Sequence, residues 1–242
     1  MAERSSRLRV KKTYKLYIGG EFPRSESGRT YEAEGQNVAR ASRKDVRDAV
    51  RAARAVQPKW AGMTAYNRGQ VLYRVAEMLE ARTPEFAELT GDEAEVNAAV
   101  DRFVWYAGWA DKLAQVIGSA NPVAGPYFNF TVPEPTGVVG IVAPDAPPLA
   151  AIELAEVLAT SDVPGGVVNL LTGHHSELAP VLASHMDVNA LDVTGSNGNV
   201  AELERLAADN VKRIVRGSAQ DQSPWEIAGF LELKTVWHPM GV

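Results

Sequence analysis

The residues of this chain that could perform covalent chemistry are few, and the most reactive type is missing. None of the 242 residues is a cysteine, which excludes disulfides, thiolate metal ligands and cysteine nucleophiles. A serine hydroxyl is a far weaker nucleophile unless a base activates it, and the sequence identifies no such base beside a serine. We therefore expect no catalytic residue.

The turn Thr194, Gly195 and Ser196 is the candidate site for a cofactor phosphate. It follows a predicted strand and opens a predicted helix, where backbone N–H groups can point at an anion. Such a turn also favours glycine and an N-capping serine for structural reasons alone. Because the chain lacks a G-x-G-x-x-G fingerprint, we expect a vestigial cofactor site without tightly bound NAD.

Three histidines are candidate metal ligands. His174 and His175 follow a predicted strand, and His185 lies further along the chain. A metal site needs a third ligand at defined geometry and an acidic outer shell. We interpret these histidines as surface residues and predict no metal.

Composition indicates a soluble globular protein, with 45% hydrophobic and 23% charged residues. The net charge of -5 gives no sign of a nucleic-acid or membrane partner. Residues 1–12 carry basic side chains without interleaved aromatics, and we interpret them as a flexible, solvated tail. No apolar run approaches the ~20 residues of a membrane span, and no signal peptide is evident, so we expect a cytoplasmic location.

The N-terminal half reads as short strands followed by amphipathic helices. Residues 14–22 alternate and turn at Gly19 and Gly20, which predicts a hairpin, with a second short strand near Thr30 pairing back to it. Helices are predicted from an N-cap at Ser42 to a stop at Pro58, then over 66–82 and 93–117. The last of these carries Trp105, Tyr106 and Trp109, and we expect some of these rings to contact another subunit.

The second half alternates between strands and helices. Residues 138–142, V-V-G-I-V, form an apolar run with proline and glycine on its flanks, which predicts a buried strand. Further strands are predicted over 167–171, 190–193 and 212–215, and helices over 149–159, 176–184 and 199–208. This alternation predicts parallel crossovers in a doubly wound, Rossmann-like sheet. Strands over 127–133 and 230–237 lie outside it, and the last must pair with an earlier strand or another subunit.

Six stretches occur in an order that resembles the aldehyde dehydrogenase superfamily. They are K-L-Y-I-G-G-E-F with S-G-R-T, V-Q-P-K-W with Y-N-R, P-T-G-V-V-G-I-V-A-P, D-V-P-G-G-V-V-N-L-L-T-G, V-T-G-S, and L-E-L-K-T-V-W-H-P. Together they cover most of the chain. The resemblance implies an α/β protein with a shortened Rossmann-like parallel sheet, N-terminal helices and a small β oligomerisation domain.

The same resemblance implies that two blocks of the family are missing. Between Ala150 and Glu153 the family carries the end of a helix, a strand, and a stretch that holds the adenosine ribose. Between Gly217 and Pro224 it carries the catalytic domain with its cysteine. We therefore divide the chain into a tail (1–12), a segment of hairpin, helices and oligomerisation strand (13–135), a shortened nucleotide-binding-like domain (136–218), and a return segment with the closing strand (219–242).

The resemblance also implies that the family's other catalytic groups are replaced. A tryptophan and an asparagine normally follow the A-P; here Asp145 and Ala146 stand there, and an ionised carboxylate would repel an oxyanion. The family's E-L-G-G, with its carboxylate base, corresponds to V-R-G-S at residues 215–218. We interpret Asp221 and Glu226 as solvated loop charges and not as a relocated base.

These observations favour a pseudoenzyme that assembles with a full-length aldehyde dehydrogenase or with itself, as a structural or regulatory subunit. One alternative is an NAD(P)-dependent aldehyde oxidoreductase subunit whose site is completed by a partner. Another is a homo-oligomer that senses an aldehyde or a nucleotide. Fold resemblance supports architecture better than activity, so the three hypotheses remain open from sequence.

Overall fold

The structure is a computed structural model that describes residues 11–144, 147–217 and 222–241. The N-terminal part contains β1 (Thr13–Tyr14), β2 (Thr30–Ala33), β3 (Gln36–Ala39), α1 (Arg43–Ala61), α2 (Ala65–Glu80) and α3 (Thr83–Thr90). The middle contains α4 (Glu93–Trp109), α5 (Leu113–Ile117), β4 (Ala120–Asn121), β5 (Tyr127–Pro135), β6 (Val139–Ile141) and α6 (Pro148–Ala159). The C-terminal part contains α7 (His175–Ser184), β7 (Ala190–Asp192), α8 (Val200–Ala207), the 3-10 helix η1 (Ala208–Asn210), β8 (Arg213–Val215), α9 (Pro224–Ala228) and β9 (Leu231–Pro239).

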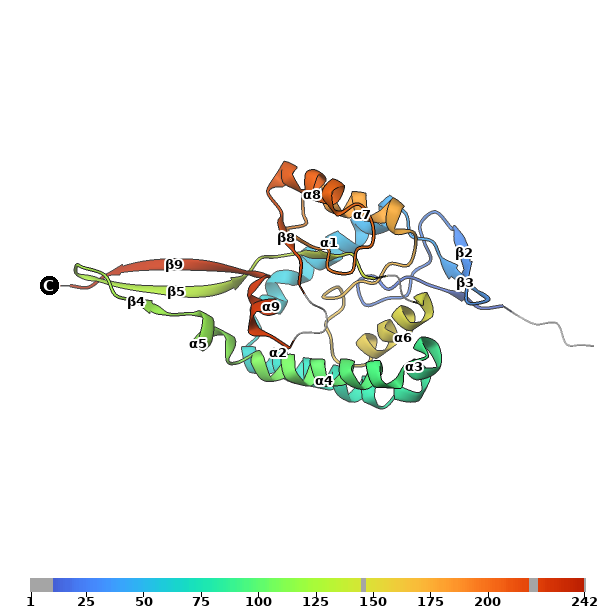
Figure 1. Cartoon of the computed structure of the whole chain (residues 1–242), viewed down its shortest axis with the longest axis horizontal. Helices are drawn as coiled ribbons and strands as arrows, with labels where there is room; N and C mark the ends of the chain where they lie inside the picture. Colours follow the sequence, from blue (N-terminus) through green and yellow to red (C-terminus); the bar gives the residue numbers. More distant parts are fainter. Residues whose placement is uncertain (1–10, 145–146, 218–221, 242) are drawn as a thin grey trace, which may run out of the picture.

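Strands β6, β7 and β8 form a parallel sheet in that order. Helices α7 and α8 lie side by side against it, above β8 in Figure 1. The core between these helices and the sheet consists of Val142, Ala179, Ala183, Leu191, Val193 and Leu203. The predicted α/β class with a parallel sheet is therefore confirmed, with three strands in the described residues.

Helices α2, α3, α4 and α6 pack together and enclose a second core. Its buried residues are Tyr17, Val75, Ala76, Leu79, Phe86, Val96, Val100, Ala155, Val157 and Leu158. Helices α2 and α4 run side by side along the lower edge of Figure 1. Gly69 permits this approach, because a Cβ there would lie 2.9 Å from the carbonyl oxygen of Ala107. Each large apolar side chain buried here contributes about 1.5–3 kcal/mol.

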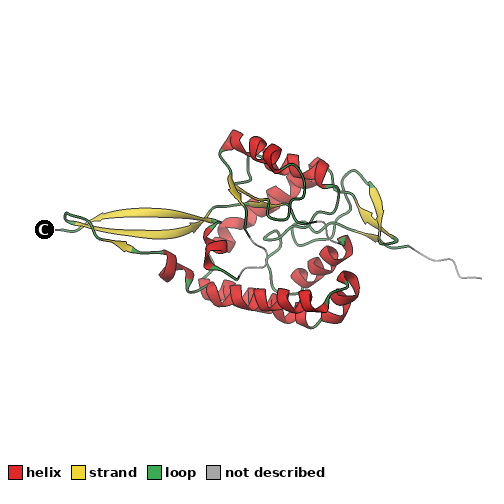
Figure 2. Cartoon of the chain, in the orientation of Figure 1, coloured by secondary structure: helices red, strands yellow, loops and turns green. Residues whose placement is uncertain are grey.

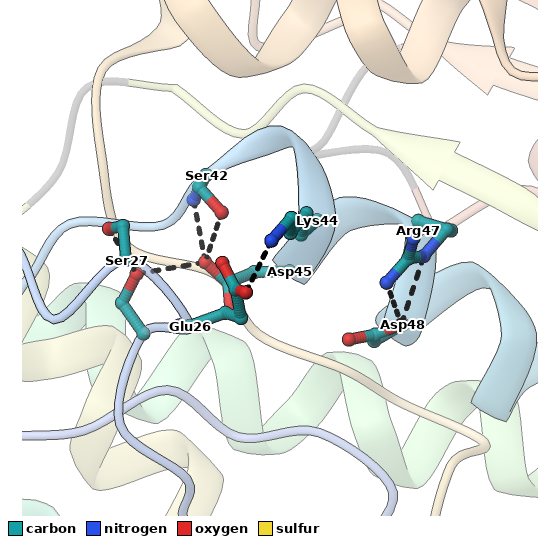
Figure 3. A network of polar contacts seen from close by, with 8 residues as sticks. Glu26, Ser27, Ser42, Lys44, Asp45, Arg47 and Asp48 are labelled. Atoms are coloured by element: carbon teal, nitrogen blue, oxygen red, sulfur yellow. Dashed lines mark hydrogen bonds and ion pairs between the residues drawn. The ribbon is translucent and has the colours of Figure 1, made fainter.

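Helix α1 begins at a buried carboxylate. The side chain of Asp45 is 3% exposed and accepts hydrogen bonds from Ser25 Oγ, the Glu26 N–H, and both the N–H and Oγ of Ser42, at 2.7–2.9 Å (Figure 3). Ser42 is thus the N-cap of a capping box, as predicted. Burial raises the pKa of the Asp45 carboxyl, but these hydrogen bonds outweigh it and the pKa is lowered from 3.8.

Strands β4, β5 and β9 form an antiparallel sheet, which we call the arm. Figure 1 shows the arm projecting from one end of the molecule, and Figure 2 shows no helix over its two long strands. Strand β9 pairs with β5 from Tyr127 opposite Pro239 to Pro135 opposite Leu231. The predicted closing strand therefore exists, and it pairs with an earlier strand of the same chain.

The prediction that residues 167–171 form a strand of the parallel sheet is wrong. This stretch is joined to Tyr17 by an isolated bridge at Leu170, with backbone N···O distances of 3.0 and 2.8 Å. An apolar run becomes a sheet strand only when neighbouring strands complete its hydrogen bonds. In the described residues β6 pairs with β7 alone, so the parallel sheet stops before this stretch.

Several predicted boundaries also differ from the structure. Pro58 does not end α1, because a proline in the last turn costs few backbone hydrogen bonds. The helix predicted over 93–117 is split into α4 and α5, where the N–H of Ala110 bonds three residues back to Ala107 at 3.3 Å and tightens the turn. The turn at Gly19 and Gly20 is confirmed, but the short strand near Thr30 pairs with β3 and not with that turn.

We predict that Asp45→Asn lowers the free energy of unfolding at pH 7 by about 2 kcal/mol, because it removes a charged acceptor from buried donors. The folded-state pKa is lowered, so this stability is present above the unfolded pKa near 3.8 and is lost as pH falls through the folded value. Urea unfolding of both proteins at neutral and acidic pH checks this: the gap between them narrows in acid.

The matched control is Asp48→Asn on the same helix. The Asp48 side chain is 41% exposed and pairs with Arg47 and Arg51 at 3.2 and 3.9 Å, and such surface pairs contribute about 0–1 kcal/mol. Equal losses in the Asp45 and Asp48 variants would contradict the role assigned to the buried carboxylate.

Candidate functional site

The carboxyl ends of β6, β7 and β8 meet at one edge of the parallel sheet. The N–H of Gly217, after β8, donates to Thr194 Oγ1, after β7, at 2.8 Å. A Cβ built on Gly195 would collide with Pro144 and lie 2.8 Å from the carbonyl carbon of Ala143, after β6. Open α/β sheets bind ligands outside this edge, so we take it as the candidate site.

The backbone donors of the predicted cofactor turn are largely used within the protein. The N–H of Thr194 donates to Asp192 Oδ1 at 2.9 Å, and that of Ser196 donates to the carbonyl of Val193 at 3.0 Å. Between them, Gly195 is packed tightly against the segment after β6. A cofactor phosphate needs N–H groups that are free to point at it. With these donors already used, the turn is poorly suited to hold the phosphates of a dinucleotide. Binding of a cofactor at Thr194, Gly195 and Ser196 is not tested by the structure and stays a prediction.

The expected N-cap at Ser196 is wrong. Helix α8 begins at Val200, and its N-cap is Asn199, whose side chain accepts from the N–H of Glu202 at 3.2 Å. The oxygen of Ser196 instead accepts from the N–H of Gly198 at 3.4 Å, inside the connecting loop. The turn is therefore separated from the helix start, where the positive end of the helix dipole would attract an anion.

A carboxylate does reach this edge of the sheet. Glu226 lies on α9, is half-buried, and faces Gly217 so closely that a Cβ there would collide with it. Its interpretation as a solvated loop charge is wrong, because α9 folds back over the end of β8. Asp221, Asp145 and Ala146 lie outside the described residues.

The three candidate histidines lie at the two ends of α7, with His174 and His175 at its start and His185 just after its last residue. The ring of His174 contacts that of Tyr31 in a tilted arrangement, with centroids 5.4 Å apart, and Nδ1 of His185 accepts from the N–H of Asp187 at 3.2 Å. Among the described residues, no three metal-ligating side chains gather at one point. Likewise, no helix in the described part of the chain is long and apolar enough to cross a membrane.

Sequence reasoning missed the contact that holds the start of β6. Asn189 Oδ1 accepts from the N–H of Val138 at 3.0 Å and from the guanidinium of Arg54 at 2.6 Å. Gly137 has φ +124°, and a Cβ there would collide with the Asn189 side chain. Asn189 lies 51 and 135 positions from its two donors, so no local pattern signals the contact.

A cavity of about 520 Å³ lies on the other side of β6. Its wall includes residues 137–143 with β6, residues 167–172, and parts of α1, α6 and α7. Most of these side chains are aliphatic, and His175, Gln57 and Thr172 are among the few polar ones. The volume is within the range of small-molecule pockets. No sequence pattern indicated it, because a cavity depends on how separate elements pack.

We predict that Gly195→Ala lowers the free energy of unfolding by about 1–3 kcal/mol, because the new methyl group overlaps backbone next to Pro144. Gly198→Ala is the matched control, since the nearest atom to its Cβ is 3.8 Å away. Urea titrations of the two variants measure their free energies of unfolding. If Gly195→Ala is as stable as Gly198→Ala, the edge is less tightly packed than described.

Comparison with known proteins places this fold. The sequence profile of the aldehyde dehydrogenase family matches residues 29–150 and 145–217. The chain is 30% identical over 248 residues to the putative aldehyde dehydrogenase DhaS of Bacillus subtilis (strain 168), covering 84% of this chain and 50% of that protein. It is 29% identical to aldehyde dehydrogenase, cytosolic 1, of Elephantulus edwardii, covering 83% and 49% of the two chains.

Solved structures show the same relationship. The NAD+ complex of an aldehyde dehydrogenase from Bacillus cereus has a TM-score of 0.77 at 26% identity, covering 84% of this chain and 50% of that one. HpcC from Thermus thermophilus has a TM-score of 0.79 at 27% identity, covering 85% and 48%. The chain spans about half the length of these relatives. Because the family profile matches well over half of the 242 residues, this chain belongs to the aldehyde dehydrogenase family.

Proposed function

We propose that this chain is a non-catalytic, cytoplasmic subunit that assembles through its arm with a full-length aldehyde dehydrogenase and stabilises or regulates it. The observation that carries the proposal is the outer edge of β9, a long strand with apolar side chains exposed on both of its faces. The chemical composition of the chain supports the non-catalytic part, and the geometry of the arm supports the assembly part.

The catalytic groups that the family resemblance implies are missing from this sequence. No cysteine exists to attack a carbonyl. The carboxyl edge of the sheet is filled by its own contacts, with Thr194 bonded to Gly217 and Gly195 packed on Pro144. A site that stabilises a transition state needs donors aimed at the developing charge, and the described residues at this edge bond to one another instead.

The arm exposes large apolar side chains on both faces. Opposite residues of an antiparallel pair share a face, so the register puts Tyr127, Leu233 and Trp237 on one side and Phe128, Val132 and Val236 on the other. Each of these six side chains is between 37% and 59% exposed. Stacking between Phe128 and Phe130, with centroids 5.2 Å apart, stiffens the second face. Exposed apolar surface of this kind marks a protein interface.

The outer edge of β9 is also ready to pair. The N–H of Thr131 donates to Ser119 at 2.8 Å, on the β4 side of β5. Thr131 lies opposite Thr235 on β9. Because the peptide groups of Thr131 point away from β9, those of Thr235 point away from β5, and the same holds for Leu233 and Trp237, two residues to either side. Among the described strands, β9 has no neighbour on this side. An unpaired edge is a template for a strand of another chain.

The edge itself is tested by Thr235→Pro. Proline removes an outward N–H and leaves the β5–β9 hydrogen bonds intact, so we expect the affinity for the full-length partner to fall by about tenfold or more. Thr235→Val, which keeps the N–H, is the control and should bind normally. Native mass spectrometry and sedimentation provide the measurement. Unchanged binding by the proline variant would exclude this edge as the interface.

Co-expression with a full-length aldehyde dehydrogenase from the same cell tests the function as a whole. We expect the two chains to co-purify, and the isolated chain to form no NADH from aldehyde and NAD+. A chain that stays monomeric without the partner and does not associate with it would overturn the proposal. So would aldehyde turnover by the chain alone, which would favour the enzyme hypothesis.

A further inference from the structure

The cavity described above lies between β6 and the stretch 167–172, whose backbone is bonded to the N-terminal segment at Leu170 and Thr172. One wall is β6 with its flanking residues, and another is the stretch 167–172 that failed to join the parallel sheet. Its volume is about 520 Å³ and its lining is mainly aliphatic. The proposed function does not use this cavity, and the arm contributes no residue to its wall.

The first wall presents an unpaired strand edge. The carbonyl of Val138 accepts from the N–H of Ala190 at 3.3 Å, and the N–H of Val142 donates to Asp192 at 2.9 Å, so these alternate residues face β7. The peptide groups of Val139 and Ile141 then point to the opposite side. In the described part of the chain, β6 has no strand on that side.

One side chain of β6 is also unusually exposed. Ile141 is 65% exposed although it lies in a strand of a parallel sheet, where both faces are normally covered and apolar residues are buried. Val138 and Val142, at the ends of the same run, are 6% and 4% exposed. Successive side chains of a strand point to opposite faces of the sheet, so Ile141 lies on the other face from Val138 and Val142, and that face is left uncovered at the end of β6.

The second wall presents an edge of the same kind. Leu170 exchanges backbone hydrogen bonds with Tyr17, and the carbonyl of Thr172 accepts from the N–H of Ala41 at 2.8 Å. In an extended chain the intervening residues turn the other way, so the peptide groups of Asn169 and Leu171 face away from Tyr17. Both residues line the cavity.

We infer that the cavity is a receptor for one extended apolar strand supplied by another polypeptide. Two strand edges and aliphatic walls suit a β-strand, which can satisfy backbone groups on both sides while its side chains fill the space. A hydrocarbon ligand would match the walls but leave the peptide groups unpaired, which is costly. A single strand needs about 4.8 Å of width for each edge it pairs with.

The comparisons support a segment missing at this place. The family profile matches in two pieces that meet at residues 145–150, directly after β6. The alignment with DhaS runs over 248 residues but uses only 84% of this 242-residue chain. That relative therefore carries residues inside the matched region that have no counterpart here.

The chain's own segments are poor candidates for the strand. Residues 1–10 include Glu3, Arg4, Arg7 and Arg9, whose charges are unfavourable in an aliphatic groove. The longest described strands, β5 and β9, already pair with each other. The occupant is accordingly a partner segment of about five residues rich in valine, isoleucine or leucine, the usual length and composition of a buried strand.

A fluorescein-labelled peptide probes the groove directly. It has five central valine and leucine residues with two lysines at each end for solubility, and its binding to the full chain is followed by fluorescence anisotropy. We expect saturable binding. An analogue with the same side chains, but N-methylated at alternate central residues, should bind at least about tenfold more weakly, because it cannot donate hydrogen bonds along one edge.

Two variants at one position locate the site. Ile141→Pro removes the N–H that faces the cavity without touching the bonds to β7, and should weaken peptide binding by roughly fivefold. Ile141→Ala keeps the N–H and should change it by no more than about twofold. Circular dichroism melting confirms that each variant is folded, and the N-methyl comparison on the unmodified chain stands independently of both.

Two results would contradict the assignment of the cavity to a β-strand. Equal binding of the plain and N-methylated peptides would show a general apolar pocket and overturn the strand assignment. Absence of saturable binding up to about 1 mM peptide, a limit that corresponds to about -4 kcal/mol, would overturn it as well. Neither result bears on assembly through the arm, which the Thr235 variants test separately.

Discussion

In the described residues, β6 is hydrogen-bonded to another strand along only one of its two edges, and this limits the width of the parallel sheet. Val138, Gly140 and Val142 face β7, and the intervening residues face a cavity. With no strand on that side in the described residues, the sheet stops at three strands. The stretch 167–172 is left to bond with the N-terminal segment at Leu170. The aliphatic cavity beside β6 lies where that missing neighbour would be.

The N-terminal segment holds the two cores together across that gap. Tyr17 is 2% exposed; its ring belongs to the helical core, while its backbone bonds to Leu170. Helix α1 packs Val46 and Val50 on the start of β6. The buried carboxylate of Asp45 fixes where that helix begins. The N-terminal elements therefore connect the helical core to the core beside the parallel sheet, a role that a wider sheet would otherwise have.

The carboxyl edge of the parallel sheet is tightly packed, whereas the arm is exposed. At the carboxyl edge of the sheet, where α/β proteins usually bind ligands, the turn at Gly195 is packed on Pro144 and its neighbours bond to each other. On the arm the opposite holds, since large apolar groups and strand edges are exposed. This difference in exposure supports the assembly role proposed above.

Features that depend on near neighbours were readable from the order of residues alone. They include the Ser42 capping box, the apolar run of β6, the alternation of β9 and the absence of cysteine. Local signals reach only a few residues, because side-chain periodicity and capping are set within one turn or strand. Which strands find partners depends on backbone brought together from distant positions. Long-range packing therefore had to establish that residues 167–171 leave the sheet, that Glu226 folds back on Gly217, and that a cavity opens beside β6.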